Sequence, residues 1–243
     1  MDRIVVSLSG SKGSGKDTVG KMLARDYGFK RAAWADGLKD ALTLIFGIDR
    51  LLFEGINKTF TVGRNWPYNE TAVKWGAIRA ATTIFDLRDR ILREDLAHEP
   101  IEEWGNATAQ ELVQTFVDGC LEVRSWDPRI ITIRQIMQYV GTDIVRERVH
   151  PMAWIKLLKR RIDRSSDPRV VITDSRFINE LKAADNMGAV FVKIDRPSII
   201  LDDHHSSENE WKAWEFDHVL ENRGTIEDLN LNVISLVTSI FKI

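Results

Sequence analysis

The sequence predicts an α/β protein with a central parallel sheet of five strands, flanked by helices and interrupted by a helical insertion in the middle of the chain. Three observations predict this class. Short runs of β-branched residues alternate with helical patterns near both ends of the chain, which is typical of a parallel sheet with right-handed crossovers. The middle of the chain has helical spacing with few strand-like runs. A glycine-rich segment joins the first expected strand to the first expected helix.

The first βα unit is expected at the start of the chain. Residues 4–8 (IVVSL) form a β-branched run of the kind that makes a buried parallel strand. A helical pattern follows over about 16–26 and stops at Gly28. Residues 29–34 are expected to form the second short strand.

Asp36 is predicted to be the N-cap of a helix that runs through Phe46, with Gly47 as its C-terminal stop. The insertion is expected at about 57–130, within a single domain that spans 1–243. The predicted helices of the middle of the chain lie near 71–97, 106–124, 132–147 and 151–164.

Strand patterns return in the last third of the chain. Three more strands are expected at residues 170–173, 189–194 and 218–220. A helix near 178–187, closed by Gly188, is expected to connect the first two of them. Thr225 and Asp228 resemble a capping box that opens a C-terminal amphipathic helix.

Composition limits the class of function. The chain of 243 residues has 34 Lys and Arg against 36 Asp and Glu, with 44% hydrophobic residues. This balance is typical of a globular protein and argues against a stable nucleic-acid partner, which usually needs a strongly basic face. Cys120 is the single cysteine, so no internal disulfide is expected. The start, MDRIVV, has no secretory signal, and no apolar run is long enough for a membrane span, so we expect a cytoplasmic protein.

Residues 10–18 (GSKGSGKDT) carry the strongest functional signal. They fit the phosphate-binding motif G-x-x-x-x-G-K and lie between a strand and a helix, as that motif requires. Glycines let the backbone N–H groups point at phosphate oxygens, and the helix N-terminus adds partial positive charge. Lys16 is expected to reach the β- and γ-phosphates of ATP. The predicted ATP-binding residues of this loop are Lys12, Gly13, Ser14, Gly15, Lys16, Asp17 and Thr18.

The position after the lysine departs from the usual motif. It is commonly Ser or Thr, whose hydroxyl binds Mg²⁺, but here it is Asp17. Thr18 follows one position later. Either Thr18 or a water held by Asp17 is expected to serve the Mg²⁺ that accompanies ATP, or Asp17 faces the acceptor.

A second half-site is expected where the strand at 170–173 ends. Asp174 follows this strand directly, at the carboxyl edge of the sheet where the phosphate loop also lies. An acid there can hold magnesium waters or orient a nucleophile, and Arg176 can neutralise charge on a transferred phosphoryl group. Asp174 and Arg176 are therefore predicted to be catalytic, together with Lys16 and Asp17.

The sequence resembles the phage-type deoxynucleoside monophosphate kinases, which belong to the P-loop nucleoside monophosphate kinases. The resemblance is collinear and spans most of the chain, although about 57–130 and the tail fit poorly. The matching stretches are residues 9–18 (SGSKGSGKDT), 38–41 (LKDA), 53–55 (FEG), 134–143 (RQIMQYVGTD), Trp154, 174–176 (DSR), 205–208 (HSSE) and 222–225 (NRGT).

The resemblance implies MgATP-dependent transfer of the γ-phosphoryl group to a deoxynucleoside 5′-monophosphate, which yields dNDP and ADP. It also implies a contact of Asn222 with ATP, makes a homodimer plausible, and would place the enzyme in the host cytoplasm if a phage encodes it. The acceptor-binding residues that it implies are Leu38, Lys39, Arg64, Arg134, Gln138, Gly141, Thr142, Asp143, Trp154, Asp174, Arg176 and Glu180.

Two other functions stay open at the level of sequence. One is a P-loop kinase of another small phosphorylated acceptor, such as phosphomevalonate or dephospho-coenzyme A. The other is an ATP-binding switch or nucleic-acid motor. Against it, the strand at 170–173 is not followed by an Asp-Glu pair that could polarise a hydrolytic water.

Three weaker patterns also have two interpretations each. Arg134, Gln138 and Gly141 have helical spacing and form either a cleft wall or a solvated stripe. The basic run at 156–164 is either a solvated helix face or a mobile lid. His204 and His205 with Glu208 form either a polar loop near the nucleotides or, less expectedly, a metal site.

Overall fold

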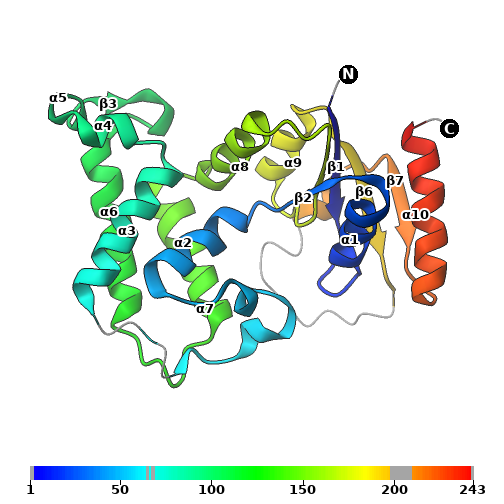
Figure 1. The fold of residues 1–243 in the computed structure, drawn as a ribbon, viewed down its shortest axis with the longest axis horizontal. Coiled ribbons are helices and arrows are strands. Elements are labelled where there is room, and N and C mark those ends of the chain that lie inside the picture. Colours follow the sequence, from blue (N-terminus) through cyan, green and yellow to red (C-terminus); the bar gives the residue numbers. More distant parts are fainter. Residues whose placement is uncertain (1–2, 64–65, 67–68, 198–209, 242–243) are drawn as a thin grey trace. The chain divides into compact units, whose positions relative to one another are not determined.

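The computed structural model describes residues 3–63, 66, 69–197 and 210–241, without the side chains of 55–56 and 94–95 (Figure 1). Two compact units divide the chain. The first consists of Met1–Trp34 and Leu158–Ile243, and the second consists of Ala35–Leu157. The region about 57–130 lies within the second unit, and the expectation of a single domain stays a prediction.

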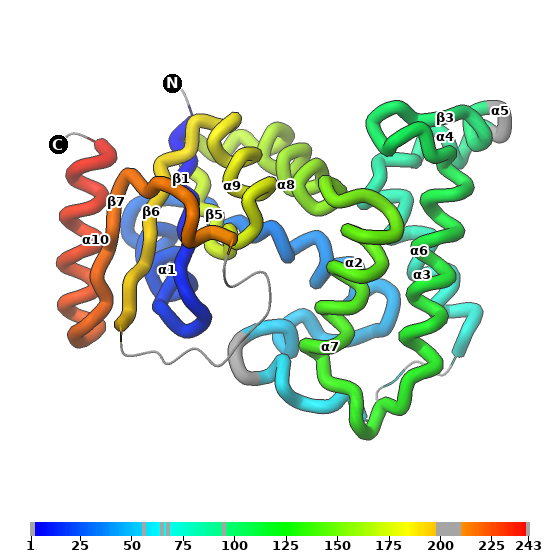
Figure 2. Tube along the Cα trace, turned by 180° about the vertical axis from the view of Figure 1, so that it is seen from behind, coloured from blue at the N-terminus to red at the C-terminus, as the bar shows by residue number. Residues whose placement is uncertain are grey.

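A five-stranded parallel sheet forms the centre of the first unit, as predicted. Its strand order is β2-β5-β1-β6-β7, and Figure 2 shows β7, β6 and β1 side by side. In the register, Val6 of the central strand aligns with Val171 on one side and Val190 on the other. The strands are β1 (Ile4–Ser9), β2 (Lys30–Ala32), β5 (Arg169–Ile172), β6 (Val190–Asp195) and β7 (His218–Glu221).

The sheet forms because its strands consist largely of apolar residues that pack against helices. Val6 and Leu8 are fully buried in β1, and they share a core cluster with Leu23 of α1 and Val233 of α10. Parallel strands covered by helices on both sides need this near-continuous apolar pattern. The helices of this unit are α1 (Lys16–Tyr27), α9 (Ile178–Asp185) and α10 (Ile226–Phe241), with the 3₁₀ turn η7 (Glu210–Ala213).

The predicted helix ends of the first unit have clear physical causes. Gly28 ends α1 in the left-handed region, with φ of 69°, which glycine adopts without steric cost. At the start of α10, Asp228 accepts a hydrogen bond from the Thr225 backbone N–H at 2.8 Å, and Thr225 Oγ1 accepts from the Asp228 N–H at 3.2 Å. The predicted capping box is therefore confirmed.

The second unit is mainly helical, with its own core. Within this unit, α3 packs most extensively against α6 and α2. Three phenylalanine rings are fully buried in this core: Phe46 of α2, Phe85 directly after α3, and Phe116 of α6. Its longer helices are α2 (Asp36–Phe46), α3 (Glu70–Ile84), α6 (Ala109–Arg124) and α7 (Ile133–Gln138), and α7 continues into the π-helical stretch η5 (Tyr139–Val149). The helix α8 (Ala153–Arg164) contains the boundary between the units.

Three expected helices of this unit differ in their bounds. Asp36 is the first residue of α2 rather than its N-cap, which is Ala35, and its carboxylate accepts a hydrogen bond from Arg50 at 2.8 Å. The helix expected at 71–97 is three helices: Asp86, with φ of 57°, turns the chain after α3, and the extended backbone of Arg93 makes the second break. The helix expected near 106 begins at Ala109, after a short antiparallel hairpin that the pattern did not predict.

The short elements of the second unit connect these helices. They are η1 (Arg50–Phe53), η2 (Gly55–Thr59), α4 (Arg88–Leu92), α5 (Glu94–Ala97), β3 (Pro100–Ile101), η4 (Glu102–Trp104) and β4 (Ala107–Thr108).

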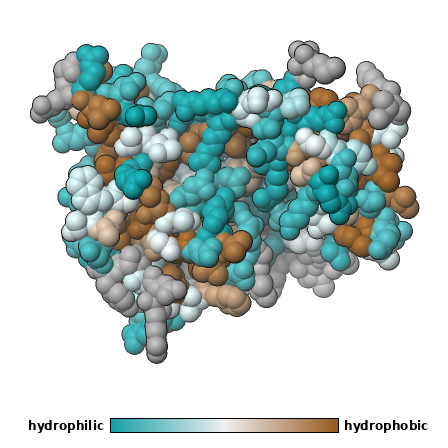
Figure 3. Space-filling model, in the orientation of Figure 1, coloured by the Kyte–Doolittle hydropathy of each residue, from teal (hydrophilic) through white to brown (hydrophobic). Residues whose placement is uncertain are grey.

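Hydrophilic and hydrophobic residues are interspersed on the face seen in Figure 3. Within the described residues, the length and polarity of every helix are incompatible with a membrane crossing.

Candidate active site

The glycine-rich loop between β1 and α1 has a backbone that only glycine adopts readily. Gly10, Gly13 and Gly15 have φ of 148°, 80° and 105°. A Cβ on Gly10 would lie 2.5 Å from the carbonyl oxygen of Ile194, so a side chain has no room there. The loop ends at the N-terminus of a twelve-residue helix. This combination of a tight glycine loop and a helix N-terminus is the arrangement that binds phosphate in proteins.

Lys16 is the first residue of α1, and its side chain turns back into the loop. Its Nζ donates hydrogen bonds to the carbonyl oxygens of Gly10 at 2.6 Å and Ser11 at 2.8 Å. Lys16 is only 8% exposed. The loop therefore holds an ammonium group at its centre, in the position where the sequence motif requires one.

Asn222 supports the same loop from the end of β7. Its Nδ2 donates to the carbonyl oxygen of Ser14 at 2.8 Å, and its backbone N–H donates to Asp195 at 2.8 Å. A Cβ on Gly15 would lie 2.6 Å from this Nδ2. Asn222 is buried, so the structure gives it a supporting role under the loop, which the family resemblance alone did not indicate.

Asp17 forms an ion pair that the sequence did not predict. Its Oδ1 lies 3.2 Å from Nη2 of Arg31, which comes from β2. The Asp17 side chain is 66% exposed, whereas Arg31 is 30% exposed. Thr18 is half-buried and Lys12 is exposed. Only the three-dimensional pairing of β2 with the sheet brings Arg31 to the loop.

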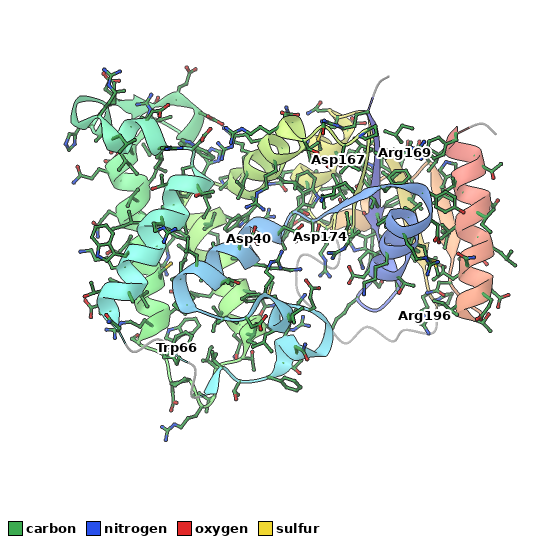
Figure 4. The ribbon with its side chains drawn as sticks, viewed as in Figure 1. Asp40, Trp66, Asp167, Arg169, Asp174 and Arg196 are labelled. Carbon is green, nitrogen blue, oxygen red and sulfur yellow. The ribbon has the colours of Figure 1, made fainter. Side chains whose placement is uncertain are left out.

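Asp174 follows β5 and is marked in Figure 4. Its Oδ1 accepts a hydrogen bond from the backbone N–H of Trp34 at 2.7 Å. The next residue, Ser175, is fully buried and fixes this turn. Its Oγ accepts from Trp34 Nε1 at 2.9 Å and lies 2.8 Å from Ser7 Oγ, while Ser9 Oγ donates to its carbonyl at 2.9 Å. These hydrogen bonds hold Asp174 at the carboxyl edge of the sheet, as predicted from the strand pattern.

Glu180 acts on the backbone of the same turn. It is 3% exposed, and its Oε2 accepts hydrogen bonds from the N–H groups of Arg176 at 3.0 Å and Phe177 at 3.2 Å. Such a carboxylate in the first turn satisfies N–H groups that a helix start leaves unpaired. Glu180 therefore positions the backbone of half-buried Arg176.

Lys39 is the main buried cation of the second unit among the predicted acceptor residues. It is 4% exposed, and its Nζ lies 2.6 Å from Oε1 of Glu54. Nη1 of Arg50 lies 3.8 Å from the same oxygen. Glu54 belongs to the stretch that matches the family at 53–55, and its carboxylate is 43% exposed. Glu54 is therefore the ion-pair partner of the buried Lys39 side chain.

Trp154 and Leu38 both lie against Gly141 in the second unit. Trp154 Nε1 donates to the Gly141 carbonyl at 2.9 Å. A Cβ on Gly141 would lie 2.6 Å from Cδ2 of Leu38. Trp154 is 3% exposed. In this arrangement Trp154 supports the start of η5 from within the core.

The remaining predicted acceptor residues lie along α7 and η5. Gln138 is exposed while Gly141 is buried, so these two residues do not share a polar face as their spacing indicated. The reason is the change to π-helical winding from Tyr139 onward, which alters the number of residues per turn. Gln138 and Asp143 line a groove of about 520 Å³ together with the rings of Trp126 and Tyr139. Arg134 and Thr142 are half-buried.

Some predicted residues lie outside the described residues, and two lysines of the basic run form ion pairs with acidic side chains. Arg64, His204, His205 and Glu208 are outside them. In the basic run, Lys156 pairs with Glu103 at 3.0 Å and Lys159 pairs with Asp163 at 2.6 Å.

The loop residues fit a magnesium ion that comes with ATP. No group of three or more His, Cys, Asp or Glu side chains could hold a metal within the part of the chain that the structure describes. Mg²⁺ usually keeps several waters and binds through one or two protein oxygens plus substrate phosphates. The exposed Asp17 carboxylate and the Thr18 hydroxyl are oxygen donors of this kind, so they suit Mg²⁺ bound mainly by the nucleotide.

The site has two parts at the same edge of the parallel sheet. One is a buried lysine inside a glycine loop, and the other is an acid and an arginine that follow a second strand. Together they define the class of P-loop phosphotransferases. Comparison with known proteins gives the family. Residues 93–233, more than half of the chain, match the family model described as deoxynucleotide monophosphate kinase. The chain belongs to this family.

Three relatives match over most of their length. The deoxynucleotide monophosphate kinase of Enterobacteria phage T4 is 25% identical, over 93% of this chain and 95% of its own. The deoxynucleoside-5′-monophosphate kinase of Escherichia phage T5 is 27% identical, over 73% of this chain and 70% of its own. A protein of Acanthamoeba polyphaga mimivirus that is named after the same family is 27% identical, over 96% of both chains.

Proposed function

We propose that this protein transfers the γ-phosphoryl group of MgATP to the 5′-phosphate of a deoxynucleoside monophosphate, giving dNDP and ADP. The burial of the Lys16 ammonium inside the glycine loop carries the proposal, together with membership in the deoxynucleotide monophosphate kinase family. The donor binds at the phosphate loop of the first unit.

The phosphate loop binds the triphosphate through several groups at once. One ammonium about 4 Å from a unit charge is worth roughly 4 kcal/mol at an effective dielectric constant near 20. A triphosphate carries more charge than one lysine can balance, so the backbone N–H groups and the N-terminus of α1 share in binding it. Thr18, or a water held by Asp17, would hold Mg²⁺ at the loop, and the ion would neutralise charge that develops on the phosphates.

Asp174 and Arg176 act at the transferred group. Phosphoryl transfer needs little covalent help from a protein and depends on positioning and charge neutralisation. Arg176, whose backbone Glu180 fixes, stabilises negative charge on the equatorial oxygens. Asp174, which Trp34 holds in place, orients the acceptor phosphate or magnesium waters.

Lys39, Arg134 and the residues of η5 bind the acceptor. The acceptor phosphate competes with Glu54 for the buried Nζ of Lys39. Because two anions must approach end to end, cations are needed on both sides of the reacting groups. The homodimer and the location in a host cytoplasm that the resemblance implies are part of this proposal.

A panel of acceptors tests the proposal. The four common deoxynucleoside monophosphates and the corresponding ribonucleotides are incubated with MgATP, and chromatography measures ADP and the diphosphate formed from each acceptor. We expect equal amounts of ADP and dNDP for at least one deoxynucleotide, and no dNDP without Mg²⁺. ADP that forms without any diphosphate of the acceptor would contradict the proposal, as would transfer only to acceptors other than nucleotides.

A further inference from the structure

The ion pair between Arg31 and Asp17 lies directly beside the phosphate loop. Arg31 Nη2 and Asp17 Oδ1 are 3.2 Å apart, and Asp17 is the residue that follows the loop lysine. The β2 backbone anchors Arg31, because Arg31 is in register with Val171 of β5. Three residues further on, the same segment holds Asp174 through the N–H of Trp34.

The stability of the fold gives little reason for this pair. Exposed ion pairs contribute little to stability, because solvent screens them and long side chains lose freedom. The pair between Arg25 and Asp26 on the same helix has a shorter N–O distance, 2.6 Å, and its arginine is 71% exposed. What distinguishes the Arg31 pair is its place next to Lys16.

The charge of Asp17 has the wrong sign for its position. An unbalanced carboxylate beside the loop repels the phosphates that the loop binds, over the short distances at which salt screens poorly. A guanidinium at hydrogen-bonding distance removes this repulsion and fixes the direction of the carboxylate. Asp17 can then serve a metal-bound water without weakening the binding of the nucleotide.

We propose that Arg31 is a positioning residue of the nucleotide site, which neutralises and orients Asp17 so that the loop accepts the polyphosphate of ATP. The inference rests on the proposed function for the identity of the nucleotide. It assigns a role to a residue that lies outside the phosphate-binding motif and that contacts the motif at Asp17.

A double-mutant cycle tests this role. The variants are Arg31→Gln, Asp17→Asn and the combination of both, with Arg31→Lys as the conservative replacement. Binding is measured by titration with a fluorescent ATP analogue in the presence of Mg²⁺, and kcat and KM are measured with the best acceptor. Arg25→Gln is the matched control, because it removes the guanidinium of another exposed pair on α1.

We expect Arg31→Gln to weaken nucleotide binding on the order of tenfold, as an uncompensated unit charge beside the site would do. In the Asp17→Asn background the same change should have no effect on binding, because the repelling charge is absent. Arg31→Lys should retain most of the affinity, and Arg25→Gln should match the wild type. The KM for MgATP should rise more than kcat falls.

Two results would overturn the inference: unchanged binding in Arg31→Gln, or an equal loss in the presence and absence of the Asp17 charge. The equilibrium titration needs no turnover. If the wild type binds the analogue and shows the coupling but forms no dNDP, the kinase proposal fails while the role of Arg31 stands. If dNDP forms and the coupling is absent, the reverse holds.

Discussion

In the proposed mechanism, single residues of the first unit carry the chemistry, and they differ in what they touch. Lys16 lies within the glycine-rich loop proposed to bind the triphosphate, whereas Arg176 belongs to the turn after β5. A group that binds both the ground state and the transition state affects binding and rate, but a group that acts only on developing charge affects mainly the rate. The two cations should therefore give different kinetic signatures.

We expect Lys16→Ala to abolish measurable transfer and weaken nucleotide binding. Arg176→Ala should lower kcat on the order of 10²-fold or more, with a smaller change in KM, as the loss of a preorganised charge donor does. Steady-state kinetics with saturating acceptor measures both. Lys21→Ala, which removes an exposed lysine of the same helix, is the control and should leave kcat and KM unchanged. Turnover like that of the wild type in Arg176→Ala would remove Arg176 from the mechanism.

Asn222 gives a second prediction at this scale, because its side chain donates a hydrogen bond to the backbone of the loop. Asn222→Ala leaves the buried Ser14 carbonyl without its donor and costs about 1 kcal/mol of unfolding free energy. We expect the KM for MgATP to rise several-fold. Asn232→Ala removes an exposed side-chain bond to the Glu221 carbonyl and should change neither quantity. Denaturant unfolding and initial-rate kinetics measure the two effects, and an unchanged KM in Asn222→Ala would contradict the role.

At the scale of elements, the end of η5 predicts a pH dependence. His150 ends this element, and its Nδ1 accepts a hydrogen bond from the N–H of Met152 at 3.1 Å. Burial, aided by the nearby Lys156 ammonium, lowers the pKa of His150 below its ordinary value of 6.5, which the Glu103 carboxylate partly offsets. The neutral imidazole is therefore the form that the fold favours.

The direction in which stability changes with pH follows from proton binding. Below pH 6.5 the unfolded chain binds a proton at His150 that the folded chain resists, so the free energy of unfolding falls as the pH decreases from 6.5 toward the folded pKa. His150→Asn keeps an accepting oxygen and cannot titrate, so we expect a smaller loss of stability over this window. Denaturant unfolding at several pH values measures it, with His98→Asn as the exposed control. Identical pH profiles of the wild type and His150→Asn would contradict the prediction.

Sequence patterns predicted the sheet and most helices because they report local physics. Apolar β-branched runs specify buried strands, and Gly28 and the Thr225 capping box mark helix ends through backbone geometry. The break at Asp86 was not predicted, because a non-glycine residue with positive φ leaves no sequence signature. The helix expected at 132–147 was extrapolated at 3.6 residues per turn, and the π winding of η5 changed which side chains share a face.

The candidate site was predicted unevenly for the same reason. The loop lysine and Asp174 follow from a motif and from a strand end, which are local signals. Arg31 and Trp34 reach these residues only through the pairing of β2 with β5, and Ser175 only through the packing of its turn on β1. Contacts that depend on sheet order have no counterpart in the spacing of a sequence.

At the scale of the whole molecule, the proposed function assigns donor and acceptor to different sets of residues. The phosphate loop belongs to the first unit, whereas Lys39 and Arg134 belong to the second. A ligand that binds only the folded state stabilises it by RT ln(1 + [L]/Kd), about 2.7 kcal/mol at a concentration of 100 Kd. Each substrate should therefore raise the unfolding temperature of the chain, but through different residues.

We expect MgATP and the preferred deoxynucleoside monophosphate each to raise the unfolding temperature by several degrees, since about 1 kcal/mol shifts it by 2–4 °C in a chain of this size. Lys16→Ala should lose the shift with MgATP and keep the shift with the monophosphate. Arg134→Ala should do the opposite, because its guanidinium is assigned to the acceptor alone. Differential scanning calorimetry with each ligand separately measures these shifts, and a product such as ADP serves as a donor-side control. If Arg134→Ala lost both shifts while its unfolding temperature without ligand stayed unchanged, the assignment of donor and acceptor to separate residue sets would be wrong, because one substitution would then have removed both binding sites.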